Sequence, residues 1–267
     1  MILEAIICFL LKLFGKKIIL IVHGGGLPIS MLANPKCYLR VLRTAHVLVA
    51  PSNFLIEALQ QYGLQVELIE NVLNLKDYQF HQKENIRPNL FWMRTFEDVY
   101  NPLMAIKVFA SLQQQYPNAK MLMAGRDAGM LAVTKTLAAQ LKVLDKITFP
   151  GYVSITKKNQ IATDFDIYIC TNNIDNAPVS LIEMMALGVV VVSTNAGGIP
   201  YLVTDKQNAL IVNMDDENAM VEAIISLINK PIFANQLTAN GLQTTKQYGE
   251  EPILKKWSQL FVRLGYV

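Results

Sequence analysis

Two carboxylates flank the predicted start of a helix between residues 174 and 183. Asp175 lies in the loop before that start, Glu183 lies about one turn inside the helix, and Pro178 suits a first helical turn because its missing N–H is not needed there. The free N–H groups of a first turn, together with the helix dipole, attract an anion such as a diphosphate. Glu183 would then reach a ribose hydroxyl pair and Asp175 a sugar. The spacing equally favours an ordinary capped surface helix, so spacing alone leaves both interpretations open.

Four positions where ligand chemistry is expected come directly after predicted strands. They are His23, Arg94, Gly125 and the segment 171–180. Ligands of open parallel sheets bind outside the carboxyl ends of the strands, so these residues are expected to approach one another.

The elements that must position these residues are helices alternating with short β-branched strands, a pattern typical of a parallel sheet covered on both faces. A first series has predicted strands at 18–22, 47–49 and 66–69, with helices at 35–43 and 52–62. A polar stretch at 71–88 is interpreted as an interdomain linker. A second series has strands at 89–93, 120–124, 146–149, 167–170, 189–193 and 209–212, and helices at 102–113, 130–141, 157–162, 178–187 and 216–229. Right-handed crossovers then predict a doubly wound sheet.

Composition limits the classes of function. The chain has 267 residues, 52% of them hydrophobic and 17% charged, which describes a globular protein of one large domain or two modest ones. A net charge of +3 without a basic run suits an anionic ligand or acidic lipid and predicts no nucleic-acid partner. Cys8, Cys37 and Cys170 have no paired spacing, so neither a disulfide framework nor a metal site is expected, and a cytoplasmic location is predicted.

The apolar segment 1–14 raises the question of a membrane segment. Lys12 interrupts it, Lys16 and Lys17 follow it, no cleavage site for a signal peptidase is apparent, and it is shorter than a bilayer span. A packed helix is therefore predicted. The same basic and apolar character leaves open a peripheral contact with the inner face of a membrane.

A resemblance to a known family adds to this interpretation. The segment 175–203 resembles the signature region of family-four glycosyltransferases, which are retaining enzymes of the two-domain GT-B fold. That signature is a Glu-x7-Glu pair followed by a valine-rich strand and a Gly-Gly-Ile/Val-Pro loop. Asp175 and Glu183 match the pair, with Asp in place of the first Glu, and residues 189–193 and 197–200 match the strand and the loop.

The resemblance extends to the predicted strand at 89–93 and its loop. Arg94 matches the arginine that binds the diphosphate of the sugar donor, whereas Val99 stands where the family has a lysine. In a metal-free site the leaving-group charge is stabilised by side-chain cations and helix N–H groups. Arg126 or Lys107 could supply the missing cation, and the sequence does not decide between them. Weaker matches include residues 147–152 beside the nucleobase, Ser52 after a strand, and the linker residue Asn71.

His23 follows a predicted strand and resembles the family's histidine that faces the sugar donor across the cleft. The glycines after it also resemble an esterase oxyanion loop, and Gly125 to Gly129 follow a strand as a nucleophile elbow would. An α/β-hydrolase needs a histidine downstream of its nucleophile. His23, His46 and His81 all lie upstream of Asp127, so the hydrolase is excluded.

The resemblance implies a GT-B type α/β fold with one complete and one partial Rossmann-like domain. Residues 1–79 are expected to form the carboxyl-terminal part of the acceptor-side domain, residues 80–245 the domain that binds the sugar donor, and residues 246–267 a helix crossing back onto the first domain. Because only about three strands of the first domain are expected, a partner chain could supply the others, and weak or absent transfer activity is predicted for this chain alone.

The implied function is metal-independent transfer, with retention, of a sugar from a nucleotide diphosphate to a glycan or lipid-linked acceptor, of the bacterial surface-polysaccharide type, without a cofactor. A non-catalytic nucleotide-sugar-binding fragment, or a subunit of a split enzyme, is the alternative. The expected catalytic residues are His23, Arg94 and Asp175. The residues expected to bind the sugar donor are Arg94, Gly125, Tyr152, Asp175, Asn176, Ala177, Pro178, Val179, Ser180 and Glu183.

Overall fold

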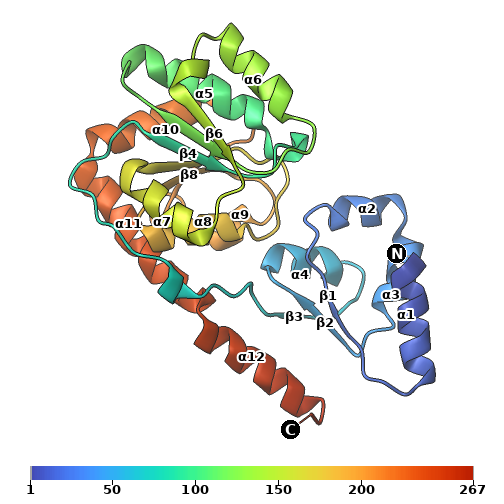
Figure 1. Ribbon diagram of the computed structural model, residues 1–267. Helices are drawn as coiled ribbons and strands as arrows, with labels where there is room; N and C mark the ends of the chain where they lie inside the picture. The colour runs from blue at the N-terminus through green and yellow to red at the C-terminus, as the bar shows by residue number, and fades with distance from the viewer. Residues whose placement is uncertain (1, 267) are drawn as a thin grey trace.

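The computed structural model describes residues 2–266, which form two separate parallel sheets (Figure 1). The first sheet has the order β1-β2-β3, with β1 (Ile19–Ile21), β2 (Val47–Ala50) and β3 (Val66–Leu68). Its helices are α1 (Ile2–Leu13), α2 (Leu27–Ala33), α3 (Pro35–Leu42) and α4 (Asn53–Gln60). The hydroxyl of Ser52 accepts a hydrogen bond from the Leu55 N–H at 3.3 Å, which caps the start of α4.

The second sheet has six parallel strands in the order β6-β5-β4-β7-β8-β9, the doubly wound arrangement that was predicted. The strands are β4 (Leu90–Met93), β5 (Met121–Ala124), β6 (Ile147–Gly151), β7 (Ile167–Cys170), β8 (Val190–Thr194) and β9 (Leu210–Val212). The helices are α5 (Pro102–Gln115), α6 (Leu131–Gln140), α7 (Ile155–Asp164), α8 (Val179–Leu187), α9 (Ile199–Leu202), α10 (Glu217–Asn229) and α11 (Pro231–Thr245). The strand order reverses between β4 and β7, which are neighbours in the sheet.

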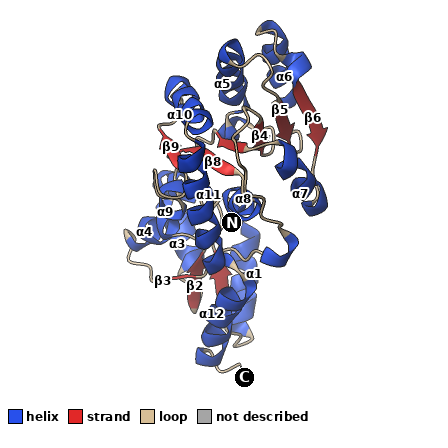
Figure 2. Ribbon diagram, turned by 90° about the vertical axis from the view of Figure 1, so that its left-hand side faces the viewer, coloured by secondary structure: helices blue, strands red, loops and turns tan. Residues whose placement is uncertain are grey.

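Two apolar cores cover the two faces of the six-stranded sheet. Trp92 packs on one face with Phe109 of α5, and Phe91 packs on the other with Leu181 of α8. Neighbouring residues of a strand point to opposite faces, which explains why β4 is apolar along its whole length. Figure 2 shows α5 and α10 on one side of the strands and α7 and α8 on the other.

The linker and the carboxyl-terminal helix α12 (Glu250–Arg263) join the two sheets. The linker contains the short helix η1 (Leu75–Asp77), and Leu73 N–H donates to the Tyr248 carbonyl at 2.7 Å. Ile253 and Leu260 of α12 pack in one cluster with Val49 of β2. The last helix therefore contacts the three-stranded sheet, whereas the domain division, with its boundaries at residues 79 and 245, stays a prediction.

Three helices, α2, α9 and α11, were not predicted from the sequence. The segment of α11 is rich in Asn, Gln and Thr, so it lacks a strong helical period of apolar residues. Its buried residues, among them Leu237, pack against the core of the six-stranded unit and stabilise the helix in spite of that composition. Tertiary packing overrides local propensity here.

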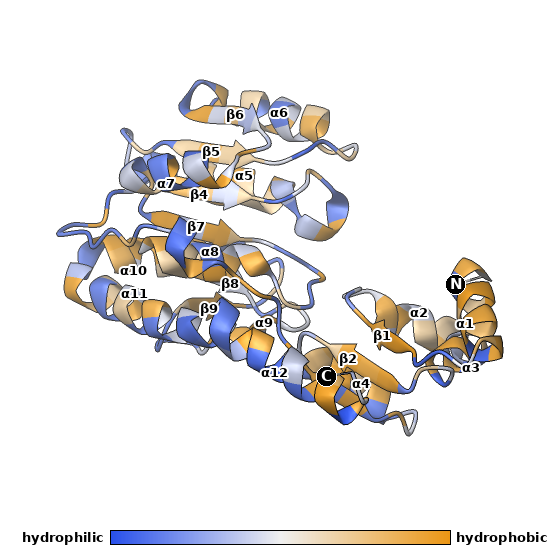
Figure 3. Ribbon diagram, turned by 60° about the horizontal axis from the view of Figure 1, so that its bottom comes forward, coloured by the Kyte–Doolittle hydropathy of each residue, from blue (hydrophilic) through white to orange (hydrophobic). Residues whose placement is uncertain are grey.

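The helix α1 confirms the predicted helical segment near the amino terminus. Cys8, Ala5 and Leu11 pack with Val41 of α3, whereas six other apolar side chains of α1 are exposed: Leu3, Ile6, Ile7, Phe9, Leu10 and Leu13. Figure 3 shows α1 as a largely hydrophobic helix. Within residues 2–266, no helix combines the length and the apolar character needed to cross a bilayer. Cys8, Cys37 and Cys170 are free thiols.

Candidate active site

Arg94 and Asp175 meet at the carboxyl end of the six-stranded sheet. Arg94 directly follows β4, and its Nη2 lies 2.6 Å from Oδ2 of Asp175, which follows β7. Asn172 Nδ2 donates to the same oxygen at 2.5 Å, and the Asn176 N–H donates to Oδ1 at 2.8 Å. Burial alone would lower the pKa of the Arg94 guanidinium, but the Asp175 carboxylate, together with smaller contributions from Tyr168, Cys170 and Tyr100, outweighs it, so the pKa is raised and Arg94 stays charged.

Close backbone contacts hold this pair in place. Gly125 follows β5 with a φ of 155°, and a Cβ built on it would lie 1.7 Å from the Arg94 carbonyl oxygen. A Cβ on Gly198 would lie 1.7 Å from the Asn176 carbonyl oxygen, and the Gly198 N–H donates to the Asp175 carbonyl at 3.0 Å. Only glycine permits such approach of two backbones. The predicted Gly-Gly loop at 197–198 thus supports the segment that carries Asp175.

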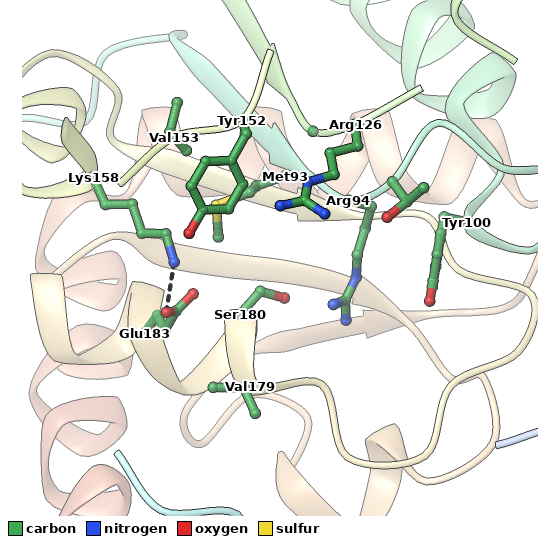
Figure 4. A pocket seen from close by; sticks show the side chains of 12 residues that line it. Met93, Arg94, Tyr100, Arg126, Tyr152, Val153, Lys158, Val179, Ser180 and Glu183 are labelled. Atoms are coloured by element: carbon green, nitrogen blue, oxygen red, sulfur yellow. Dashed lines mark hydrogen bonds and ion pairs between the residues drawn. The ribbon is translucent and has the colours of Figure 1, made fainter. Parts of the chain in front are cut away.

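A pocket of about 430 Å³ opens beside Arg94, at the reversal of strand order between β4 and β7 (Figure 4). Six of the residues predicted to bind the sugar donor line it: Arg94, Gly125, Tyr152, Val179, Ser180 and Glu183. Its other lining residues are Met93, Thr95, Tyr100, Arg126, Val153 and Lys158. His23, Asp175, Asn176, Ala177 and Pro178 do not line it.

The start of α8 faces this pocket. Pro178 has a ψ of 105°, which is extended, so it is the residue before the helix, and the placement of Pro178 within the first turn is wrong by one position. The helix begins at Val179, and Pro178 provides no side-chain cap. Val179 and Ser180 therefore bring the first turn, with its N–H groups, to the wall of the pocket.

Glu183 has two partners that the sequence analysis missed. Lys158 Nζ lies 2.6 Å from Glu183 Oε1, and the Tyr78 hydroxyl donates to the same oxygen at 2.7 Å. Burial and the hydrogen bond to Glu183 raise the pKa of Tyr78, so it remains a hydrogen-bond donor at neutral pH. A signal for Lys158 existed, since it precedes the buried Ile161 and Ala162 of α7 by three and four residues and shares their face. Tyr78 lies in the linker, where no periodic spacing of apolar residues distinguishes it.

The side chain of Asn176 connects the loop after β7 to the amino-terminal region. Its Nδ2 donates to the His23 carbonyl at 3.0 Å, and its Oδ1 accepts a hydrogen bond from the Ser52 hydroxyl. The linker residue Asn71 donates from Nδ2 to the Ala177 carbonyl at 3.3 Å. The backbone of His23 thus contacts the loop, while His23 itself is an exposed residue, so its catalytic role stays a prediction.

Lys107 and Arg126, the two candidates to replace the family's lysine at the position of Val99, have different surroundings. Lys107 lies on α5 and pairs with Glu217 of α10 at 2.7 Å, and it does not line the pocket. Arg126 follows Gly125 and lines the pocket together with Arg94. The structure therefore places only Arg126 beside the candidate site.

Known proteins resemble this chain in sequence and in structure. Residues 76–244 match the family model of glycosyl transferases group 1. An uncharacterized glycosyltransferase of Haemophilus influenzae is 28% identical over 158 residues, covering 57% of this chain and 42% of that protein. An alpha-1,4-N-acetyl-D-galactosaminyltransferase of Campylobacter jejuni is 25% identical over 186 residues, covering 68% of this chain and 49% of that protein. The name of that protein includes a PP-undecaprenol-linked oligosaccharide. The chain spans less than half the length of these two relatives.

Among solved structures, HepE of Anabaena in complex with UDP and glucose has a TM-score of 0.83 at 15% identity. The match covers 99% of this chain and 75% of HepE. It shows a shared fold of Rossmann-like parallel sheets. The family match covers more than half of the chain and includes Arg94, Gly125, Asp175 and the whole of α8. The chain belongs to the family of glycosyl transferases group 1.

Proposed function

We propose that the pocket beside Arg94 binds a nucleotide diphosphate sugar and that the chain takes part in transferring the sugar, with retention and without a metal ion, to a glycan or lipid-linked acceptor. The observation that carries this proposal is the meeting of the Arg94 guanidinium and the start of α8 in one pocket at the switch point of the sheet. The presence of UDP and glucose in the structure of HepE supports it.

The main requirement of the proposed reaction is that the site stabilises the negative charge of the departing diphosphate. Arg94 donates to phosphate oxygens with its guanidinium, and the N–H groups at the start of α8 donate from the other side. Among the described side chains, Arg94 Nε is buried without a hydrogen-bond partner, and an oxygen of the ligand would satisfy it. These charge-assisted bonds stabilise the leaving group in place of a metal ion.

The two carboxylates have separate proposed roles. Asp175 orients Arg94 and accepts hydrogen bonds from hydroxyls of the transferred sugar. Glu183 accepts hydrogen bonds from the ribose, and its Oε2 is the oxygen assigned to that contact because Lys158 and Tyr78 both bind Oε1. His23 is proposed to approach the sugar from the amino-terminal region, where Gly25 lies against the backbone of Asp175 and Asn176.

The experiment that tests this proposal is transfer or hydrolysis of radiolabelled nucleotide sugars by the purified chain. A panel of UDP-, GDP- and ADP-sugars covers the bases, and NMR of the product gives the anomeric configuration. We expect the Asp175→Asn variant to lose turnover and Lys107→Gln, outside the pocket, to keep it. Turnover that survives Asp175→Asn unchanged would contradict the proposed site.

A non-catalytic nucleotide-sugar binder is the second candidate. The observation that favours it is the small first sheet, which has three strands among the described residues, with β1 at its edge. Saturable binding of a nucleoside diphosphate without turnover, even with an added partner half, would support the binder. Turnover by the chain alone would exclude it.

Contacts with other surfaces remain proposals as well. The exposed apolar side chains of α1 support a peripheral contact with the cytoplasmic face of a membrane that contains acidic lipids. The nearby basic residues Lys12, Lys16 and Lys17 support the same contact. The edge of β1 supports a partner chain that adds strands to the first sheet. Flotation with anionic and neutral liposomes tests the first contact, and the mass of the complex formed with a separately supplied amino-terminal half tests the second.

A further inference from the structure

Three cationic side chains line the pocket, and two of them are already paired with carboxylates of the site. Arg94 pairs with Asp175, and Lys158 pairs with Glu183, each with an N to O distance of 2.6 Å. The third cation is Arg126. Across the part of the chain that the structure describes, no ion pair joins Arg126 to a carboxylate. The pocket therefore holds one positive charge that its own carboxylates do not neutralise.

The nearest carboxylate in the sequence does not serve Arg126. The carboxylate of Asp127 accepts hydrogen bonds from the N–H groups of Gly129 at 2.8 Å and Leu131 at 3.1 Å, at the start of α6. These bonds lower the pKa of Asp127 and keep its side chain ionised and directed to that helix. The Arg126 guanidinium lies over the ring of Tyr152, with its central carbon 5.4 Å from the ring centroid.

The backbone places Arg126 beside Arg94. The two residues follow the neighbouring parallel strands β5 and β4, and the Arg94 N–H donates to the Ala124 carbonyl at 3.0 Å. The Arg126 carbonyl accepts a hydrogen bond from the Phe96 N–H at 2.8 Å. Figure 4 shows both guanidinium groups extending into the pocket above the start of α8, with Ser180 on the opposite side.

We propose that Arg126 is a second diphosphate-binding cation of this site. It binds the phosphates together with Arg94 and the start of α8. This inference rests on the proposed function, because it assigns a residue to the diphosphate of the same ligand. A guanidinium forms two parallel hydrogen bonds with a phosphate, and an unpaired guanidinium gains more from an anion than one that already holds a carboxylate. Arg126 lies beside the ring of Tyr152, whereas Arg94 is held by Asp175.

The test compares ligands that differ only in their phosphates. Affinities of UDP, GDP and ADP, of the corresponding monophosphates and of the nucleosides are measured by titration calorimetry for the wild-type chain and for Arg126→Gln. We expect the variant to lose about 10- to 100-fold in affinity for the nucleoside diphosphate that the wild type binds best. The loss for the nucleoside should stay within about twofold.

Two further variants make the result specific. Arg126→Lys keeps the charge and should recover most of the lost affinity. Lys157→Gln removes an equal charge from an exposed neighbour of the pocket lysine on α7 and should bind all ligands as the wild type does. Because Arg126 is exposed, all three variants should melt at the wild-type temperature.

Each other outcome overturns the inference in a distinguishable way. Unchanged affinity of Arg126→Gln for the diphosphate shows that Arg126 does not hold the phosphates. An equal loss for diphosphate and nucleoside shows that Arg126 acts on the base with Tyr152. A wild-type chain that binds none of the nine ligands contradicts the proposed function itself, and this inference with it.

Discussion

The six-stranded and three-stranded sheets differ in how completely their apolar surfaces are covered. Helices pack on both faces of the six-stranded sheet, and all four residues of β5 and of β7 are buried. In the three-stranded sheet the edge strand β1 leaves Ile21 45% exposed, and α1 exposes most of its apolar side chains. The residues of the candidate pocket come from the better covered unit, which can hold charged side chains in fixed positions.

The amino-terminal region contributes to the site mainly through contacts with one loop. Ser52 and the backbone of His23 hold the side chain of Asn176, next to Asp175. The two units therefore have separate tasks: the larger one positions the charges, and the smaller one restrains the loop that carries Asp175.

Arg94→Met should produce the largest effect. It removes one of the three cations that line the pocket and leaves the Asp175 carboxylate without its ion-pair partner. We expect nucleotide-sugar turnover to fall by about 10²–10³-fold, the cost of losing one charge-stabilising donor. Steady-state kinetics check the loss, and Arg94→Lys should restore part of the activity. Wild-type turnover by Arg94→Met would show that the charges of the larger unit do not stabilise the reaction.

Gly198→Ala should destabilise the protein by about 3 kcal/mol, because its Cβ would lie 1.7 Å from the Asn176 carbonyl oxygen. Chemical denaturation measures the change. Gly24→Ala is a matched control, since a Cβ built there has no heavy atom within 4 Å. Equal stabilities of the two variants would refute the close packing under the loop of Asp175.

Asp166→Asn should lower the stability of the larger unit by about 2 kcal/mol. The buried carboxylate of Asp166 accepts hydrogen bonds from the Arg87 N–H at 2.9 Å, Nε at 2.8 Å and Nη2 at 2.7 Å. Although burial opposes them, these bonds and the nearby Lys83 lower the pKa of Asp166.

The sign of this pKa shift predicts a pH dependence. A carboxylate with a lowered pKa stabilises the folded state fully above its unfolded pKa of about 3.9, and this stabilisation is lost as pH falls through the folded pKa. Wild type and Asp166→Asn should therefore differ at pH 7 and converge in acid. A difference in unfolding free energy between wild type and Asp166→Asn that stays constant down to pH 2 would contradict this prediction.

Asn176→Ala should cost about 1 kcal/mol of stability, since it removes the hydrogen bonds to Ser52 and to the His23 carbonyl. Ser52→Ala removes one of the same bonds, so the double variant should lose less than the sum of the two single losses. Hydrogen exchange should also increase in residues 174–177. Additive losses and unchanged exchange would show that the smaller unit does not restrain the loop.

Leu13→Gln should produce the smallest effect. Leu13 is 67% exposed on α1, so its replacement should change the unfolding free energy by less than about 0.5 kcal/mol. The buried Met31 of α2 is the matched contrast, and Met31→Ala should cost about 2–5 kcal/mol. A large loss for Leu13→Gln would mean that the apolar face of α1 is covered in solution.

Much of this division could be predicted from the sequence, because it depends on local patterns. Short apolar runs located every strand of the described residues, and residues that follow strands, such as Arg94 and Gly125, were expected at one edge of the sheet. The pairing of Arg94 with Asp175 agrees with the resemblance at those two positions. Lys158 and Tyr78 were missed because tertiary packing, which no local period encodes, brings a helix and a linker to Glu183.

The most direct measurement is a crystal structure of the chain with the nucleoside diphosphate that binds it in solution. The account predicts phosphate oxygens within about 2.7–3.2 Å of the Arg94 guanidinium and of an N–H group at the start of α8. A diphosphate bound elsewhere on the protein, or a pocket left empty at concentrations that saturate the protein in solution, would contradict it.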